Sequence, residues 1–201
     1  LGAHLSVEDG VEGTHFAVWA PGATNVYVMG SFNYWNETQY PMNKLGDGGI
    51  YSLFIPGVKE GDMYKFVIDT WYANRIQKAD PYANKAEMRP GTASIVTDIT
   101  GYEWSDSKWM EERDKKDPNK QPMAIYECHI GMAQEKEGIG TYREFREHIL
   151  PRIHSLGYNT IQIMAIMEHP YYGSFGYQVS SFFAACSRYG TPNELKELID
   201  A

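Results

Sequence analysis

The spacing of hydrophobic residues changes along this chain, from short alternating runs to a pattern of strand and helix. Apolar and polar residues alternate over residues 14–19, 25–29, 51–55 and 63–68, with Gly, Asn and Asp between these runs. A last strand is expected around residues 93–96. Alternation with a period of two, broken by turn residues, is typical of strands that bury one face. The pattern predicts an all-β sandwich over residues 1–104.

A charged segment, residues 105–121, follows the predicted sandwich. It reads S-D-S-K-W-M-E-E-R-D-K-K-D-P-N-K-Q and contains few aliphatic residues. Charges of both signs on a stretch without apolar spacing indicate a solvated connection. We therefore predict a linker here and assign no chemistry to it.

After Pro122 the pattern predicts strands that alternate with helices. A short strand is expected at residues 123–129. Thr141 and Glu144 then have the spacing of a capping box, and the residues after the cap place their apolar side chains on one helix face. Pro151 lies within this helical pattern and predicts a kink or a break.

The same region predicts a second strand and a second helix. The run I-Q-I-M-A-I-M at 161–167 is nearly continuously apolar, which favours a parallel strand covered on both faces. Thr191, Pro192 and Glu194 provide an N-cap, a proline in the first turn and a capping-box acid. The order of strand, helix, strand, loop and helix predicts a parallel α/β unit.

The composition favours a protein that binds flat, partly polar ligands. Fifteen Tyr, eight Phe and five Trp make up 14% of the chain, and rings beyond the needs of a core suit sugars. An aromatic-rich core is the alternative explanation for most of them. The net charge of −8, without a cluster of Lys and Arg, argues against a nucleic acid or an anionic membrane as partner.

The cysteines and histidines indicate neither a disulfide nor a metal site. Cys128 and Cys186 lack C-x-x-C spacing and lie among apolar or small residues, so we expect reduced, packed thiols in a cytoplasmic protein. The six histidines are scattered without metal-ligand spacing, and we expect no metal and no cofactor. No apolar run reaches the roughly 18 residues of a membrane span, and the N-terminus lacks a signal-peptide pattern.

Three motifs in the predicted sandwich resemble one known family. They are A-V-W-A-P-G-A at 17–23, G-S-F-N-Y-W-N at 30–36 and K-A-D-P-Y-A at 78–83. These motifs resemble the amino-terminal β-sandwich, a glycogen-binding type of module, that precedes the barrel in glycogen branching enzymes and their relatives. Ser31 stands where the family pattern G-D-F-N-x-W has an acidic residue.

This resemblance implies a glucan contact in the sandwich. In relatives the Trp of the pattern and the residues after it can contact glucan, which corresponds to Trp35, Asn36 and Glu37 in this chain. The alternative is that Trp35 packs the loop against the sandwich, because Trp is highly buried on average. The sequence leaves both interpretations open.

A second segment, residues 164–190, resembles branching enzymes over its whole length. It contains E-H-P-Y-Y-G-S-F-G-Y-Q and is similar to the segment after the second barrel strand of the family. Debranching enzymes and amylases of the same clan more often carry G-Y-D, so Gln178 favours branching. By the resemblance, Tyr177 stacks its ring on the glucose next to the cleaved bond. A Tyr that packs the barrel rim and a Gln178 that only braces the loop are the alternatives.

The resemblance also implies a fold and indicates whether catalytic residues are expected in this chain. The fold is multidomain, β plus α/β: an immunoglobulin-like β-sandwich, the linker, and at 122–201 the first two β/α units of a TIM (β/α)8 barrel, which typically needs about 250 residues. Retaining glycoside chemistry needs two carboxyl groups about 5–5.5 Å apart. In the family the catalytic acids come from later strands, so we expect no catalytic residue here. Glu168 and His169 are interpreted as supports for the 171–177 loop, and Glu127 and His129 likewise.

The sequence thus favours the amino-terminal part of a 1,4-alpha-glucan branching enzyme, which transfers a glucan segment to a 6-hydroxyl and binds glycogen or starch. The fragment itself is expected to be inactive. Two other hypotheses stay open: a module whose only function is glucan binding, and a debranching enzyme of the same clan.

Overall fold

The computed structural model describes residues 1–72, 74–117 and 120–201, which form two compact units. The first unit comprises Leu1–Asp98 with Ser180–Ala184, and the second comprises Ile99–Val179 with Ala185–Ala201. Each unit contains a hydrophobic core of its own.

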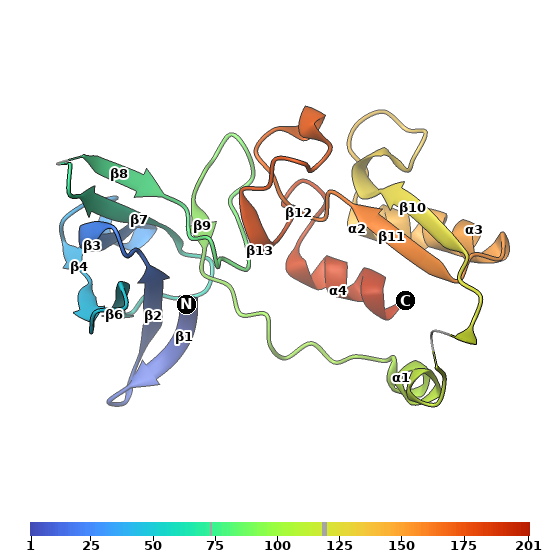
Figure 1. Ribbon diagram of the computed structural model, residues 1–201, viewed down its shortest axis with the longest axis horizontal. Helices are drawn as coiled ribbons and strands as arrows, with labels where there is room; N and C mark the ends of the chain where they lie inside the picture. The colour runs from blue at the N-terminus through green and yellow to red at the C-terminus, as the bar shows by residue number, and fades with distance from the viewer. Residues whose placement is uncertain (73, 118–119) are drawn as a thin grey trace. The chain divides into compact units, whose positions relative to one another are not determined.

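Two antiparallel sheets make up most of the first unit (Figure 1). One has the strand order β1-β2-β6-β5, and the other has the order β4-β3-β7-β8, with β9 also paired to β7. The strands are β1 Gly2–Glu8, β2 Val11–Trp19, β3 Ala23–Gly30, β4 Tyr40–Pro41, β5 Asn43–Leu45, β6 Ile50–Pro56, β7 Met63–Thr70, β8 Arg75–Lys78 and β9 Ser94–Ile95. The alternating runs predicted from the sequence are confirmed as β2, β3, β6 and β7. The edge strand β1 was not predicted.

Alternation along the strands decides which side chains form the core of the first unit. In β2, Phe16 is buried, whereas its neighbour His15 points to the outer face. Phe16 packs edge-on against Tyr64 of β7, with ring centroids 5.0 Å apart. The buried Tyr64 hydroxyl donates a 2.6 Å hydrogen bond to Asp80. Burial raises the pKa of the Asp80 carboxyl, while the Tyr64 hydrogen bond acts in the opposite direction.

The second unit is built on a parallel strand pair with helices (Figure 1). β10 (Ile125–His129) pairs in parallel with β11 (Thr160–Met164), with Ile125 opposite Thr160 and His129 opposite Met164. The other elements are α1 Ser107–Asp114, η3 Ile130–Met132, α2 Tyr142–Glu144, the π-helical turn η4 Phe145–Ile149, α3 Leu150–Ser155, β12 Met167–Glu168, η5 Tyr172–Ser174, β13 Ser181–Ala185 at the unit boundary, and α4 Pro192–Asp200.

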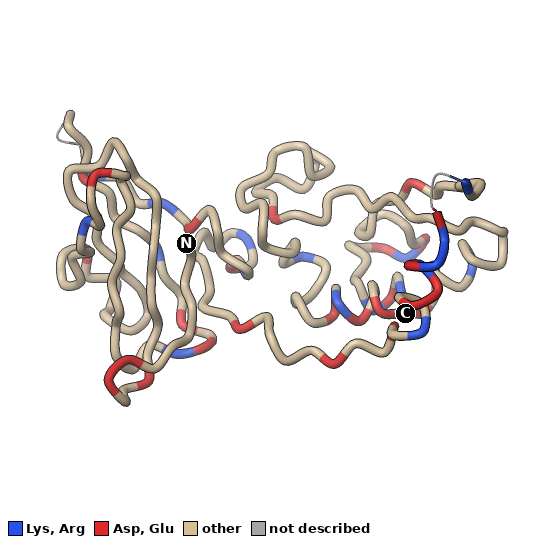
Figure 2. The backbone as a smooth tube through the Cα atoms, turned by 60° about the horizontal axis from the view of Figure 1, so that its bottom comes forward, with Lys and Arg blue, Asp and Glu red and all other residues tan. Residues whose placement is uncertain are grey.

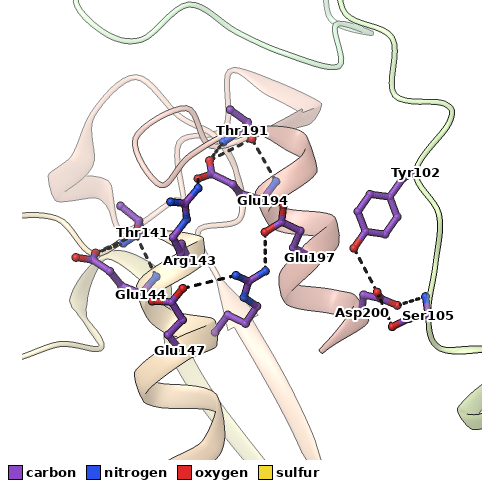
Figure 3. Close-up of polar contacts among 11 residues, drawn as sticks. Tyr102, Ser105, Thr141, Arg143, Glu144, Glu147, Thr191, Glu194, Glu197 and Asp200 are labelled. Carbon is purple, nitrogen blue, oxygen red and sulfur yellow. Dashed lines mark hydrogen bonds and ion pairs between the residues drawn. The ribbon is translucent and has the colours of Figure 1, made fainter.

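Both predicted capping boxes are confirmed (Figure 3). Thr141 Oγ1 accepts a hydrogen bond from Glu144 N, and Glu144 Oε2 accepts one from Thr141 N. Thr191 and Glu194 form the same pair of bonds at the start of α4. Each pair satisfies backbone N–H groups that the first turn of a helix leaves unbonded, which is why both helices begin at these residues.

Ion pairs join the two helical segments that follow these caps. Arg143 contacts Glu194 at 3.2 Å (Figure 3). Arg146 Nη1 contacts Glu197 Oε2 at 2.5 Å. Asp200, in the last turn of α4, accepts a 2.8 Å hydrogen bond from the backbone N–H of Ser105. These contacts hold α4 against its neighbours within the second unit.

The helix that contains Pro151 changes its hydrogen-bonding pattern before the proline. Phe145–Ile149 form a π-helical turn, and α3 continues through Pro151 to Ser155. Proline lacks an N–H donor and its ring crowds the carbonyl four residues earlier, so the widened turn relieves the conflict. The irregularity predicted at Pro151 therefore takes the form of a π-helical turn.

The prediction of one strand covered on both faces at 161–167 is wrong. β11 ends at Met164, Ala165 adopts a φ of 57°, and extended pairing resumes in β12. Every residue of this run keeps at least partial exposure. Ile161 and Ile163 pack against the core, so only one face of β11 is covered by the described part of the chain. The apolar run could not reveal this, because it looks the same whether one face or two are buried.

The predicted linker, residues 105–121, contains the helix α1, which was not predicted. Its residues bury no side chain fully, and the good helix formers Lys, Met, Glu and Arg account for it without a packed face. Residues 118 and 119 of this predicted linker lie outside the described residues. Cys128 and Cys186 are buried free thiols, and burial raises the pKa of the Cys128 thiol to about 11. Within the described ranges, no helix is long and apolar enough to span a membrane.

Candidate functional site

A rigid turn presents Trp35 at the end of β3 in the first unit. Tyr34 and Trp35 have φ values of 53° and 60°, a left-handed conformation that non-glycine residues rarely adopt. The buried Asn33 side chain holds the turn, because its Oδ1 accepts from Gly30 N at 2.9 Å and its Nδ2 donates to Asn36 O at 3.0 Å. Backbone strain that the surroundings hold in place is common at ligand sites.

The side chains in this turn are open to solvent to different degrees. Tyr34 is 97% exposed and Trp35 is 38% exposed. Asn36 is exposed, and its side chain accepts a 3.0 Å hydrogen bond from Thr38 N. Trp35 is thus neither fully buried nor free, and it can offer a fixed aromatic edge to a ligand.

A pocket of about 340 Å³ lies beside Trp35. Its walls include Met29, Trp35, Lys65, Gln77, Glu87 and Thr92. Lys65 lies opposite Met29 on the paired strands β3 and β7, and its ammonium group donates to the Thr92 hydroxyl. An aromatic ring next to a lysine, a hydroxyl and an amide is a suitable arrangement for a polar ligand with apolar faces.

Glu37 is tied to the outer face of the same sheet instead of facing solvent alone. Gln77 Nε2 donates to Glu37 Oε1 at 2.6 Å, and Arg75 lies 3.7 Å from the Glu37 carboxylate. Arg75 also binds Asp69 with two hydrogen bonds of 2.7 and 2.9 Å and covers the ring of Tyr27. The hydrogen bond from Arg75 lowers the pKa of Asp69. This network fixes the residues that follow Trp35.

Sequence reasoning did not find the residues that complete this pocket. Lys65 and Gln77 lie on two different strands, and Thr92 lies in a loop before β9. Alternation along β7 indicates that Lys65 faces outward, but only strand pairing brings it next to β3.

In the second unit, the strand ends carry a loop that exposes Tyr177. Tyr177 is 81% exposed, and Gln178 beside it is also exposed. The loop is closed by its own backbone, since Ser174 N, Phe175 N and Tyr177 N donate to carbonyls three residues earlier at 3.0 to 3.1 Å. Phe175 points back into the unit, with its ring edge-on to His129 at 6.2 Å. The loop therefore places one aromatic ring, the partly exposed Phe175, against His129 and leaves Tyr177 open to solvent.

Glu168 and His169 are buried and directly precede this loop in sequence. Glu168 Oε2 accepts a 2.7 Å hydrogen bond from Ser187 N, and His169 Nδ1 donates to Met167 O at 2.9 Å. A buried carboxylate that is bound to backbone N–H is suited to hold the neighbouring loop in place, because it cannot reach a ligand in solvent. Glu127, on β10, is exposed.

His129 lies at the end of β10 among aromatic rings. The ring of Tyr189 lies 5.8 Å away, and its hydroxyl is 3.4 Å from His129 Nε2. Burial lowers the pKa of His129, and the nearby His169 lowers it further. A neutral imidazole in this place packs as part of the core.

Comparisons with known proteins first show which family and which solved structures the chain is similar to. Residues 1–83 match the family model of carbohydrate-binding module 48 (isoamylase N-terminal domain). This match covers the two-sheet unit that carries Trp35. The putative alpha amylase from Salmonella typhimurium superimposes on 99% of the chain and 30% of its own length, with a TM-score of 0.76 and 26% identity. A pullulanase from Bacillus acidopullulyticus covers 100% of the chain and 27% of its own length at a TM-score of 0.74 and 23% identity, which shows the fold alone.

The relatives found by sequence point to a more specific group of proteins than the family model does. The chain is 48% identical to the 1,4-alpha-glucan branching enzyme GlgB of Butyrivibrio fibrisolvens and 47% identical to that of Bacillus cytotoxicus, in both cases over its whole length. It spans about a third of these relatives, 32% and 31% respectively, at their amino-terminal part. The resemblance to the amino-terminal part of branching enzymes is thereby confirmed.

Proposed function

We propose that this chain is the amino-terminal part of a 1,4-alpha-glucan branching enzyme. The observation that carries the proposal is the identity of 48% with such an enzyme across both units. The parent enzyme would cleave an α-1,4 linkage, keep the released segment as a covalent glycosyl intermediate and transfer it to a 6-hydroxyl.

In this proposal each unit has its own role in binding α-glucan. The first unit binds α-glucan at the pocket beside Trp35, with Asn36 and Glu37 at its rim. The second unit is the beginning of a (β/α)8 barrel, which the parallel pair β10 and β11 with its intervening helical segment supports. Tyr177 and Gln178 form one wall of the donor-sugar site.

The proposal places no catalytic carboxylate in this chain. Glu168 is committed to Ser187 N and lies 3.8 Å from Arg188, so it is a support of the loop and not a nucleophile. The barrel strands that follow in the parent protein supply the reacting acids. The buried, unpaired thiols Cys128 and Cys186 are consistent with a cytoplasmic enzyme. Lys and Arg are spread along both units (Figure 2), which supports a neutral partner such as α-glucan.

Tyr177 variants of the full-length protein that contains this chain test the proposal. Tyr177→Ala removes the ring and is expected to lower kcat/KM for branching of amylose by about fivefold or more, since stacked aromatic contacts contribute on the order of 1 kcal/mol or more. Tyr177→Phe keeps the ring and is expected to retain most activity. Equal activity of wild type and Tyr177→Ala would remove Tyr177 from the site. Hydrolysis of α-1,6 linkages would favour the debranching alternative instead.

A glucan-binding module without its own catalysis is the second candidate function. The pocket beside Trp35 favours it, because that pocket lies within the first unit alone. A full-length protein that binds glycogen but forms no α-1,6 linkage would support this candidate.

A further inference from the structure

We infer that Arg188 is a positioning residue that locks the Tyr177 loop onto the strand ends, together with Glu168. This inference rests on the proposed role of Tyr177 in glucan binding. Arg188 follows β13 in the sequence and does not belong to the loop itself. Its side chain is only 12% exposed.

The guanidinium group of Arg188 holds the start of the loop by its backbone. Nη1 donates to His169 O at 2.6 Å, and Nη2 donates to Pro170 O at 2.8 Å. Two donors in a fixed plane thus bind two consecutive carbonyl groups. Lysine cannot reproduce this, because its ammonium is a single point on a flexible stem.

Glu168 balances the buried charge of Arg188 and holds the guanidinium in place from the other side. The two groups lie 3.8 Å apart, and Glu168 Oε2 accepts from the N–H of Ser187, the residue before Arg188. The carboxylate thereby binds the backbone that carries Arg188, while Arg188 binds the backbone after Glu168. This reciprocal arrangement fixes two segments about twenty residues apart in sequence.

The far end of the loop is held by close packing. Gly176 has a φ of 83°, and a Cβ at this position would lie 2.4 Å from Ala165 Cα. Ala165 itself is left-handed, at the break between β11 and β12. Arg188 at one end and the Gly176–Ala165 contact at the other leave Tyr177 exposed on a loop with two fixed ends.

A double-mutant cycle in the full-length protein separates positioning from stability. Arg188→Met, which keeps the apolar stem, is combined with Tyr177→Ala, and kcat/KM for branching is measured for all four forms. We expect Arg188→Met alone to lower kcat/KM by about tenfold, since a misplacement near 1 Å can cost about a hundredfold. In the Tyr177→Ala background the further loss should be about twofold or less, because the residue through which Arg188 acts is gone.

Two further variants keep the test decisive. Arg146→Met is the matched control: it breaks an ion pair with Glu197 in the same unit, so its effect on kcat/KM should be independent of Tyr177. Arg188→Lys keeps the charge beside Glu168 and is the second variant if Arg188→Met does not fold. It should also lose activity and show the same coupling to Tyr177.

The outcomes distinguish this inference from the proposed function. Losses from Arg188 and Tyr177 variants that multiply would overturn the positioning role while leaving the role of Tyr177 intact. A Tyr177→Ala variant with full branching activity would remove Tyr177 from the site and overturn this inference, while the proposed branching function would stand. A full-length protein that forms no α-1,6 linkage would instead refute the proposed function. Partial rescue of Arg188→Ala by millimolar guanidinium, with no rescue of the Arg188→Ala, Tyr177→Ala double variant, would support the inference, because added guanidinium can occupy the vacated site.

Discussion

Replacement of Trp35 by alanine tests the glucan site of the first unit. Trp35 is 38% exposed. A Trp side chain presents at most about 250 Å², so a sugar that covers the exposed part buries about 95 Å², equivalent to about 2.4 kcal/mol at roughly 25 cal/mol per Å². This corresponds to about fiftyfold in Kd as an upper limit, and we expect a loss of about tenfold to fiftyfold.

Affinity electrophoresis of the chain in gels with glycogen measures this change directly. Wild type should be retarded, and Trp35→Ala should migrate close to its position in a gel without glycogen. The matched control is Trp109→Ala, because Trp109 is also exposed but lies on α1 of the second unit and does not line the pocket beside Trp35. Equal retardation of wild type and Trp35→Ala would refute the argument and leave Trp35 with a packing role only.

Two further predictions concern stability. Tyr64→Phe removes the donor to the buried Asp80 and should lower the free energy of unfolding by about 1–3 kcal/mol in urea titrations. Because the folded pKa of Asp80 is raised, this deficit should shrink as the pH falls and the carboxyl becomes protonated; a deficit that grows in acid would contradict the assignment. Hydrogen bonds from Lys136 and Thr141 lower the pKa of Glu144 to about 2. Glu144 therefore stabilises the fold above its unfolded pKa near 4.5, and this contribution is lost as the pH falls toward 2. Thermal melts of wild type and Glu144→Gln should differ at neutral pH and converge in acid, and an equal difference at both would exclude the carboxylate.

The strands and helix starts could be predicted because local chemistry determines them. Alternation in β2, β3, β6 and β7 and the two capping boxes at Thr141 and Thr191 need only nearby residues. The break at Ala165 could not be predicted, since an apolar run carries no sign of a left-handed residue. It arises where Gly176 packs against the strand, a contact between residues distant in sequence.

The candidate sites divide in the same way. Motifs indicated Trp35 and Tyr177, because both lie in short runs with a recognisable pattern. Lys65 and Arg188 were not predicted. Strand pairing brings Lys65 to its site, and Arg188 reaches its site through a backbone contact between residues distant in sequence. The exposure of Trp35 could not be predicted either, because the sequence alone does not distinguish a partly exposed Trp from a packed one.

The central claim is that this chain carries glucan-binding parts of a branching enzyme but not its reacting carboxylates. The most direct measurement compares the 201-residue chain with the full-length protein that contains it, by counting new α-1,6 linkages formed in amylose. The account predicts new α-1,6 linkages from the full-length protein, and none from the chain alone even though glycogen retards it. New α-1,6 linkages formed by the chain alone, or none formed by the full-length protein, would contradict it.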